Sequence, residues 1–259
     1  MGDIHGAYIL LLQCLERAGF DKENDTLIQI GDIADGWPYV YECVEELLTI
    51  KHRVDILGNH DEWLRRFLQT GIHPDYWMQG GQGTVISYLR AAGLLEEHGA
   101  TRFLKPHDIP ASHVNFFLNQ RLYYKDETNR LFVHGGFDRH ETLDAQAQYN
   151  PSVFYWDREL WRQALSAHDI FGLKFKEDFA EIFIGHTETQ FWTKLGRMTR
   201  ASVFQRGSDP TCAPMHADII YNVDTGAGST GCLTIMNIET KEFWQSDPVN
   251  TIYGSFNYR

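Results

Sequence analysis

The chain has 259 residues, a length that fits one large α/β domain, and no stretch approaches the roughly 18 to 20 consecutive apolar residues that span a bilayer. Its formal net charge of −12 opposes binding to a nucleic-acid backbone, because that binding depends on neutralising phosphates with basic side chains. We therefore expect a globular, soluble protein that binds neither a nucleic-acid polymer nor a membrane.

The amino terminus runs directly into the polar segment Gly2–Gly6 and lacks the basic and then apolar pattern of a secretory signal. Asp3 and His5 are two residues apart, so their side chains point the same way in an extended chain. If they follow a strand, about five apolar residues should precede them, whereas only Met1 does. We therefore expect the first strand to be truncated before residue 2.

In the first half of the chain, predicted helices alternate with predicted strands. Apolar residues at helical spacing alternate with short apolar runs that read as strands. The predicted helices cover 8–18, 38–50, 61–70 and 84–93, and the predicted strands cover 26–30 and 53–57. The insert at 94–118 gives no readable pattern.

The second half is richer in strand patterns, separated by Gly, Thr and Asn signals. Strands are predicted over 119–125, 130–133, 182–184, 201–205, 218–223, 231–237 and 242–246, with one helix over 157–167. No linker or repeat divides the chain, so we expect a single domain over 1–259. The predicted fold class is α/β, a sandwich of two mixed β-sheets flanked by helices.

Polar clusters follow four of the predicted strands directly. Because ligands bind beyond the carboxyl ends of strands in open α/β sheets, these clusters are expected to converge on one edge. The clusters are Gly31-Asp32, Gly58-Asn59-His60-Asp61, His134-Gly135-Gly136 and Gly185-His186-Thr187.

The candidate ligands are carboxylate, imidazole and amide groups, which suit a borderline divalent metal such as Mn, Fe, Zn or Co. Six such groups are too many for one ion with an open position. Two ions roughly 3.5 to 4 Å apart that share a carboxylate would use them all, and we expect Asp32 to be the bridge. The predicted ligands are Asp3, His5, Asp32, Asn59, His134 and His186.

The motifs Gly-Asp-Ile-His-Gly, Gly-Asp-Ile-Ala-Asp-Gly, Gly-Asn-His-Asp, Val-His-Gly-Gly and Gly-His-Thr resemble the ordered set of calcineurin-like metallophosphoesterases. The chain is most similar to the bacterial and phage phosphoprotein phosphatases, a branch that also contains diadenosine tetraphosphate hydrolases. The resemblance runs from residue 2 to about residue 240. It includes Gly80-Gly81 with Thr84, Ser87 and Tyr88, Trp156-Asp157-Arg158, and Asp224-Thr225-Gly226.

The resemblance implies a role for each candidate residue. Asp3 and His5 would hold the first metal ion, Asp32 would bridge, and Asn59, His134 and His186 would hold the second ion, with manganese the expected metal. A hydroxide between the ions would attack phosphorus. His60 would protonate the leaving group, Asp61 would hold the imidazole, and Arg158 would clamp phosphate oxygens.

The chain departs from this family pattern at two positions. The family usually has Arg where this chain has Gly36, so one phosphate contact is lost or comes from elsewhere. The family commonly has Glu where this chain has Asp61, a shorter carboxylate with the same chemistry.

Simpler roles stay open for several of these residues. Asp35 could form turn hydrogen bonds or belong to the site, and Asn59 and Asp61 could cap the following helix. Arg158 could form an ordinary surface ion pair, and Asp224 fits a loop support better than a metal ligand.

The leading functional hypothesis is a phosphomonoesterase of the protein Ser/Thr phosphatase type, acting on phosphorylated proteins or small phosphoesters. The alternatives are a dinucleoside polyphosphate hydrolase and a catalytically inactive, phosphatase-like binding module. Widely spaced cysteines without a CxxC pair favour reduced thiols and a cytoplasmic location. They are Cys14, Cys43, Cys212 and Cys232.

Overall fold

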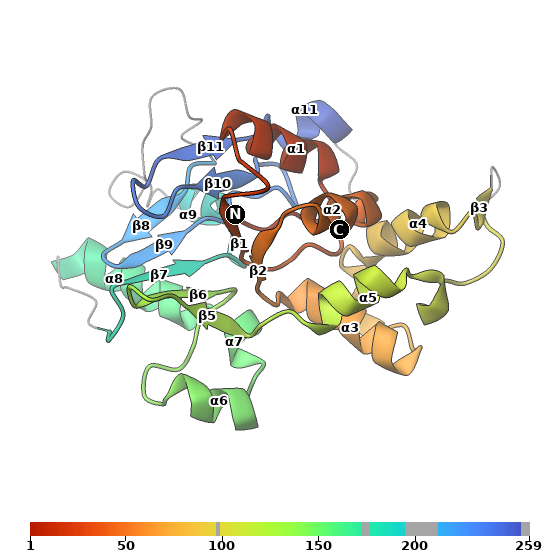
Figure 1. Cartoon of the computed structure of the whole chain (residues 1–259). Helices are drawn as coiled ribbons and strands as arrows, with labels where there is room; N and C mark the ends of the chain where they lie inside the picture. Colours follow the sequence, from red (N-terminus) through yellow and green to blue (C-terminus); the bar gives the residue numbers. More distant parts are fainter. Residues whose placement is uncertain (97–98, 172–176, 195–211, 255–259) are drawn as a thin grey trace.

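The computed structural model describes residues 1–96, 99–171, 177–194 and 212–254. In these residues helices and strands alternate early in the chain, and strands predominate towards its end (Figure 1). The strand predicted over 201–205 lies outside the described residues.

The first part of the chain forms the predicted elements with small shifts at their ends. α1 forms because Leu10, Leu11 and Leu15 fall on one face and are buried there, and α3 ends where Gly71 adopts a left-handed φ of 71°. The elements are α1 (Tyr8–Arg17), β1 (Thr26–Gln29), α2 (Val40–Leu48), β2 (His52–Asp55), α3 (Asn59–Thr70), η1 (Asp75–Met78) and α4 (Gly81–Ala91).

The segment 94–118, whose structure was not predicted, contains two short strands, a 3-10 helix and one α-helix. The strand predicted over 119–125 is shorter than expected, because Arg121 donates its N–H to Asp55 O (2.9 Å) and so joins β2. The elements of this region are β3 (Leu95–Glu96), β4 (Gly99–Ala100), η2 (Pro106–Asp108), α5 (Ala111–Leu118) and β5 (Tyr123–Lys125).

The second part contains four helices that the periodicity did not predict, α6, α7, α9 and α11. The strand predicted over 218–223 corresponds to β9, which forms a hairpin with the unpredicted strand β8 before it. The hairpin turns at Asp218, which has a φ of 54°. The elements are β6 (Arg130–Val133), α6 (Leu143–Tyr149), α7 (Val153–Trp156), α8 (Glu159–Phe171), β7 (Glu181–Ile184), α9 (Thr189–Lys194), β8 (Met215–Ala217), β9 (Ile220–Asn222), β10 (Thr234–Met236), β11 (Phe243–Gln245) and α11 (Val249–Tyr253).

Five strands form one mixed sheet in the order β5-β6-β7-β9-β8. β6, β7 and β9 are parallel neighbours, and β5 and β8 pair antiparallel at the two edges. The carboxyl ends of the three parallel strands therefore lie at the same edge of the sheet.

A second layer is built from two strand pairs, β1 with β2 in parallel and β10 with β11 in antiparallel orientation. The first two residues of the chain connect these pairs: Ile30 donates its N–H to Met1 O (3.1 Å), and Gly2 donates to Thr234 O (3.0 Å). The two pairs are thus joined edge to edge through Met1 and Gly2.

Apolar side chains fill the space between the two layers. Phe132 and Phe183 stack with ring centroids 5.0 Å apart, and Ile30, Met236 and Phe243 pack in the same cluster. In Figure 1, α1 and α2 lie on the side of β1 and β10, and α7 and α8 lie on the side of the five-stranded sheet. The predicted class, a mixed α/β fold with helices flanking mixed sheets, is confirmed.

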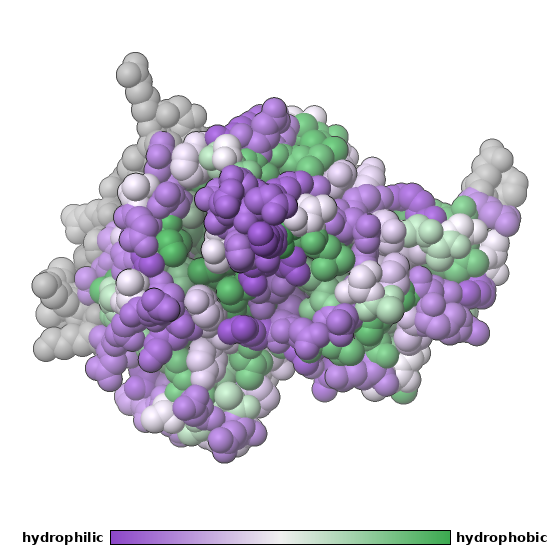
Figure 2. Space-filling model, viewed as in Figure 1, coloured by the Kyte–Doolittle hydropathy of each residue, from purple (hydrophilic) through white to green (hydrophobic). Residues whose placement is uncertain are grey.

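The surface agrees with the composition. The face shown in Figure 2 is largely hydrophilic, with its apolar residues scattered in small groups. Among the described residues, no helix combines the length and the apolar character that crossing a bilayer requires.

Replacing Phe183 tests the contact between the layers. Phe183→Ala removes a ring that is 2% exposed, and we expect the free energy of unfolding to fall by about 3–5 kcal/mol. Urea denaturation followed by circular dichroism measures this change. The control is Ile72→Ala at a side chain that is 71% exposed, which should cost under about 0.5 kcal/mol. Equal effects of the two substitutions would show that the ring does not hold the layers together.

Candidate metal centre

The six predicted ligands occupy the ends of parallel strands and the segment before α1. Asp32, His134 and His186 follow β1, β6 and β7, and Asn59 is the first residue of α3, after β2. All six residues are at most 7% exposed. Polar groups taken this far out of water must find partners or a cation.

Asp32 lies at the centre of the cluster. Its Oδ2 is 3.5 Å from His5 Nε2 and 3.4 Å from His134 Nε2, and its Oδ1 accepts the His60 N–H (3.0 Å). Two groups of side chains could each hold an ion, His5 with Asp32 and His60, and Asp32 with His134 and His186. Asp32 belongs to both groups, so its carboxylate has the position that a bridging ligand requires.

The side chain of His134 is oriented by the backbone. Its Nδ1 donates to Ile30 O (2.8 Å), which leaves Nε2 to face Asp32 and Asn59, whose Oδ1 is 3.2 Å away. The ring centroids of His134 and His186 are 5.0 Å apart. A backbone carbonyl on the outer nitrogen of a histidine is the usual way to fix a metal-binding imidazole.

Two buried atoms of the cluster have no hydrogen-bond partner among the described residues, Asp3 Oδ1 and His186 Nε2. The other carboxylate oxygen of Asp3 accepts the His186 N–H (3.0 Å). An orphaned carboxylate oxygen and imidazole nitrogen in a buried site fit a divalent cation, which would satisfy both. His5 is grouped with Asp32 and His60 rather than with Asp3, so the assignment of Asp3 to the first ion stays a prediction.

The pKa values of the two buried carboxyl groups, Asp3 and Asp32, are shifted in opposite directions. Burial and then the Asp224 carboxylate raise the pKa of Asp3 well above its usual range. Burial also opposes ionisation of Asp32, but the positive charges of His134 and His60 outweigh it and hold the pKa of Asp32 well below its usual range. At Asp3 the charge of His134 lowers the pKa but does not outweigh burial and Asp224, whereas at Asp32 the histidines outweigh burial.

His134 and His186, which share one cluster with Asp32, differ in protonation. Burial and then the charge of His134 hold the pKa of His186 well below its usual value, so its ring is neutral and can act as a ligand. Burial opposes protonation of His134, but Asp32 and Asp3 raise its pKa to about 9. A cation that binds here would replace that proton.

His60 is positioned by Asp35, and the prediction that Asp61 holds this imidazole is wrong. His60 Nδ1 lies 2.9 Å from Asp35 Oδ2. Asp35 Oδ1 accepts from Trp77 Nε1 (2.9 Å) and Thr84 Oγ1 (2.7 Å). Asp35 therefore contacts the site rather than only forming turn hydrogen bonds, and Trp77 and Thr84 hold its carboxylate in place.

Asp61 instead ties the loop after β1 to the start of α3. Its Oδ1 accepts the N–H groups of Ile33 and Ala34 (2.9 Å each), and its Oδ2 accepts from Gln120 Nε2 (2.8 Å) and Gly58 N (3.3 Å). The bond to Gly58 N is the capping role that the sequence left open. Burial and then the charge of Asp32 raise the pKa of Asp61 to about 6.

Arg158 lies beside the His186 loop. Its Nη1 donates to His186 O (2.9 Å) and Thr187 Oγ1 (2.6 Å). The guanidinium lines a cavity of about 410 Å³ together with His186 and Asp224. Asp224 Oδ1 accepts the Gly226 N–H (3.1 Å), which agrees with the expected loop support.

The backbone of the site adopts unusual conformations. His5, Asp32, Asp35 and His186 have φ values of 50°, 54°, 67° and 66°. Each such residue other than glycine costs on the order of 1–3 kcal/mol and is concentrated at functional sites. This strain shows that packing around the strand ends, rather than local preference, places these side chains.

A side chain at Gly36 would be strained in this structure. Its φ is +84°, and a Cβ atom would lie 2.9 Å from His5 O and 3.0 Å from His5 Cβ. An arginine here, which the family resemblance leads one to expect, would require a strained backbone and a shift of His5.

A family model for calcineurin-like phosphoesterases matches residues 1–218. The chain belongs to the calcineurin-like phosphoesterase family. It is accordingly a metal-dependent phosphoesterase, and this hydrolase family uses a dinuclear metal centre, as expected from the sequence. The residues described above fit that group, because Asp32 is shared between two clusters and each cluster offers oxygen and nitrogen ligands.

Relatives of this phosphoesterase carry two kinds of names. Serine/threonine-protein phosphatase 1 of Salmonella typhimurium is 25% identical over 92% of this chain and 90% of its own length. A symmetrical bis(5'-nucleosyl)-tetraphosphatase of Buchnera aphidicola is 40% identical, but over only 24% of this chain and 23% of its own length. Among solved structures, a proposed diadenosine tetraphosphatase covers 95% of this chain and 90% of its own, with 17% identity and a TM-score of 0.57, which supports the fold alone.

Substitution of Asp32 tests the metal centre of this phosphoesterase. Asp32→Asn keeps the shape of the side chain but removes the charge between the two clusters, so we expect the bound metal to fall from two ions per chain towards none. Mass spectrometry of metals after dialysis measures the content. Glu127→Gln, at an exposed carboxylate, is the matched control and should keep both ions. Full metal content in Asp32→Asn would remove Asp32 from the ligand set.

Proposed function

We propose that this phosphoesterase hydrolyses phosphomonoesters of the phosphoserine and phosphothreonine type, with His60 as the general acid. The single observation that carries the proposal is the placement of His60. Its imidazole pairs with Asp35 through Nδ1 (2.9 Å), and it is grouped with His5 and Asp32 in the cluster that could hold an ion. An acid in this position can protonate an alkoxide that leaves phosphorus.

The proposed ligand set is Asp3, His5, Asp32, Asn59, His134 and His186, with manganese as the metal and iron, zinc or cobalt as alternatives. When bound, two divalent cations supply positive charge that makes water a nucleophile near neutral pH and neutralises phosphate oxygens. This chemistry leaves proton delivery and substrate positioning to the side chains. Asp35 keeps the His60 ring oriented through its contact with Nδ1 (2.9 Å).

Arg158 is proposed to bind phosphate oxygens. Its side chain lines the cavity beside His186, and one guanidinium nitrogen already donates to His186 O and Thr187 Oγ1. Such a fixed planar donor binds a phosphate at a defined angle. Because an arginine at Gly36 would be strained, Arg158 is the proposed main clamp.

A phosphoprotein or small phosphoester is favoured over a dinucleoside polyphosphate by the length of the match to each class. The protein phosphatase relative aligns over 92% of this chain, and tetraphosphatase relatives such as those of Buchnera aphidicola and Coxiella burnetii align over 24% to 37%. We further propose that residues 1–259 act as one domain and that the protein works in the cytoplasm.

Parallel assays on three substrates test the proposed substrate class. With added manganese we expect phosphate release from a phosphothreonine peptide and from p-nitrophenyl phosphate, and slower release of ADP from diadenosine tetraphosphate. Chelation should abolish all three activities and manganese should restore them. Turnover of the dinucleotide alone would favour the alternative, and hydrolysis that survives thorough metal removal would contradict the mechanism.

Three substitutions separate the acid from its surroundings. His60→Asn should lower kcat by about 10² to 10⁴, the usual contribution of a general acid, and Asp35→Asn should lower it in the same direction by a smaller factor, with metal content unchanged in both. Asp61→Asn should mainly lower the free energy of unfolding, by about 1–3 kcal/mol, because it disturbs buried hydrogen bonds.

The matched control for these variants is His107→Asn at an exposed histidine. Steady-state kinetics, metal analysis and urea denaturation are measured on each protein. Loss of metal from His60→Asn would move His60 into the ligand set, and an unchanged kcat in Asp35→Asn would remove Asp35 from the mechanism.

A further inference from the structure

Two cysteines in the second part of the chain lie side by side in the interior. The Sγ atoms of Cys212 and Cys232 are 3.0 Å apart, although the residues are separated by 20 positions in the sequence. Both side chains are at most 3% exposed. Buried cysteines usually pack as small apolar side chains, but two sulfur atoms this close can also bond to each other after a shift of about 1 Å. Neither thiol takes part in the proposed phosphoester hydrolysis.

Hydrogen bonds of the main chain hold the two thiols in this position. Gln245 Nε2 donates to Cys212 O (2.8 Å) and to Thr234 Oγ1 (2.9 Å). Thr225 O accepts the Cys232 N–H (3.1 Å), and Thr225 Oγ1 donates to Cys232 O (2.7 Å). The hydroxyl oxygens of Thr225 and Thr234 are themselves 2.7 Å apart. One network therefore fixes the backbone at both cysteines, so the fold has already brought the two sulfur atoms together.

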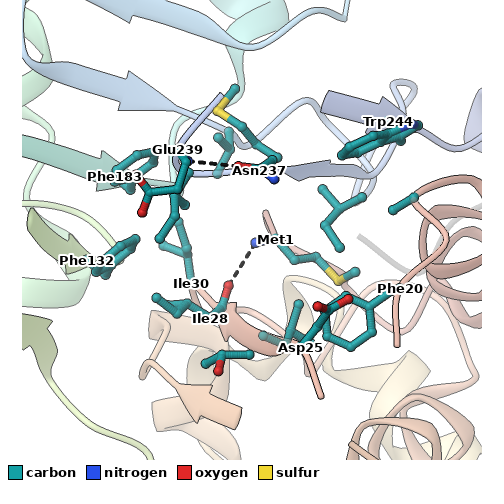
Figure 3. Close-up of a pocket in the computed structure, with 17 residues that line it drawn as sticks. Met1, Phe20, Asp25, Ile28, Ile30, Phe132, Phe183, Asn237, Glu239 and Trp244 are labelled. Carbon is teal, nitrogen blue, oxygen red and sulfur yellow. Dashed lines mark hydrogen bonds between the residues drawn. The ribbon is translucent and has the colours of Figure 1, made fainter. Parts of the chain in front are cut away.

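The pair lies where the two layers of the fold meet. Cys212 comes shortly before β8, an edge strand of the five-stranded sheet, and Cys232 comes shortly before β10 of the second layer. β10 pairs with β11 on one side. On its other side a cavity of about 290 Å³ lies between β10 and β1, with Met1 between Ile28 and Asn237 (Figure 3). A covalent bond at the start of β10 would thus reinforce a strand that is incompletely packed on one side.

The chain between the two cysteines contains part of the candidate site. It includes β8, β9 and the loop that begins at Asp224. Asp224 lines the cavity beside Arg158 and His186. A bond between the cysteines would close this segment into a ring, which restricts the loop and lowers the conformational entropy of the unfolded chain.

The other two cysteines provide an internal comparison. Cys14 Sγ donates to Leu233 O (3.2 Å), and burial raises the pKa of this thiol to about 12. Burial and then the charge of Glu42 raise the pKa of Cys43 well above its usual value. The thiolate is the form that reacts with an oxidant, so we expect both of these thiols to stay reduced in the folded chain.

We propose that Cys212 and Cys232 form an oxidation site that takes a hydroperoxide and closes a reversible disulfide between the segments before β8 and β10. One sulfur attacks a peroxide oxygen, the O–O bond breaks, and the departing oxygen leaves as water with the proton of that thiol. The second sulfur then attacks the resulting sulfenic acid, the S–O bond breaks, and a second water leaves with the other thiol proton. Two electrons pass from the thiols to the peroxide, which yields one disulfide and two molecules of water.

The burial of the pair favours a small oxidant. Hydrogen peroxide is only slightly larger than water, so a small local opening of the chain admits it, whereas a bulky thiol reagent needs a larger one. A thiol reductant returns the disulfide to two thiols. In a reducing compartment the modification therefore persists only while the oxidant is present.

Peptide mapping after exposure to hydrogen peroxide tests the proposal. The 259-residue chain is treated with increasing peroxide, quenched with catalase, unfolded and alkylated. Oxidation of Met78, whose side chain is 87% exposed, shows that the dose is sufficient. At that dose we expect a cross-linked peptide that contains Cys212 and Cys232, the loss of two of the four thiols, and the return of both after dithiothreitol.

Persistence of both thiols at that dose would overturn the proposal and assign the pair to packing alone. Sulfinic acid at either sulfur without the cross-linked peptide would overturn it as well. The result in the unsubstituted chain decides the question even where a cysteine variant does not fold.

Thermal unfolding tests the reinforcement of β10. We expect the oxidised chain to have a Tm higher by ~5 °C or more than the same sample after dithiothreitol. Cys232→Ser should remove the cross-link and the reversible shift, whereas Cys43→Ala, at a buried cysteine outside the pair, should keep both. Equal Tm values before and after reduction of a cross-linked chain would overturn the reinforcement. These measurements use no substrate, so they are independent of the proposed phosphoesterase specificity.

Discussion

The structure depends on one buried carboxylate, that of Asp32, which two clusters of side chains share. Its Oδ2 is within 3.5 Å of the imidazoles of both His5 and His134, and these residues come from opposite layers of the fold. In water such an arrangement would contribute little, but inside the protein the charges interact strongly and need compensation. The surrounding strands must therefore place histidine side chains next to this carboxylate.

The sheets supply that convergence through their topology. β1 and β2 are parallel in one layer and β6 and β7 are parallel in the other, so four loops end beside Asp32. The loops are tight enough to force Asp32 and His186 into positive φ, and packing between the layers must outweigh that strain. At these positions the packing that stabilises the fold also fixes the geometry of the site.

Much of this was predictable from the sequence, because strand ends are visible as apolar runs followed by glycine and polar residues. The partner of His60 was not, since Asp61 is its neighbour in sequence whereas Asp35 lies 25 residues away. Asp61 is the third residue of α3 and turns back to the helix start, whereas Asp35 is brought to the ring by Trp77 and Thr84 from elsewhere in the chain. β8 was not predicted, because Met215–Ala217 is only three residues long and has the polar His216 at its centre.

The central claim is that two cations bind on either side of Asp32, and anomalous diffraction from crystals grown with manganese tests it most directly. Two anomalous peaks that flank the carboxylate, one beside His5 and one beside His134 and His186, are the predicted result. A single peak, or peaks away from Asp32, would contradict the account, because the carboxylate would then not be shared between two ions.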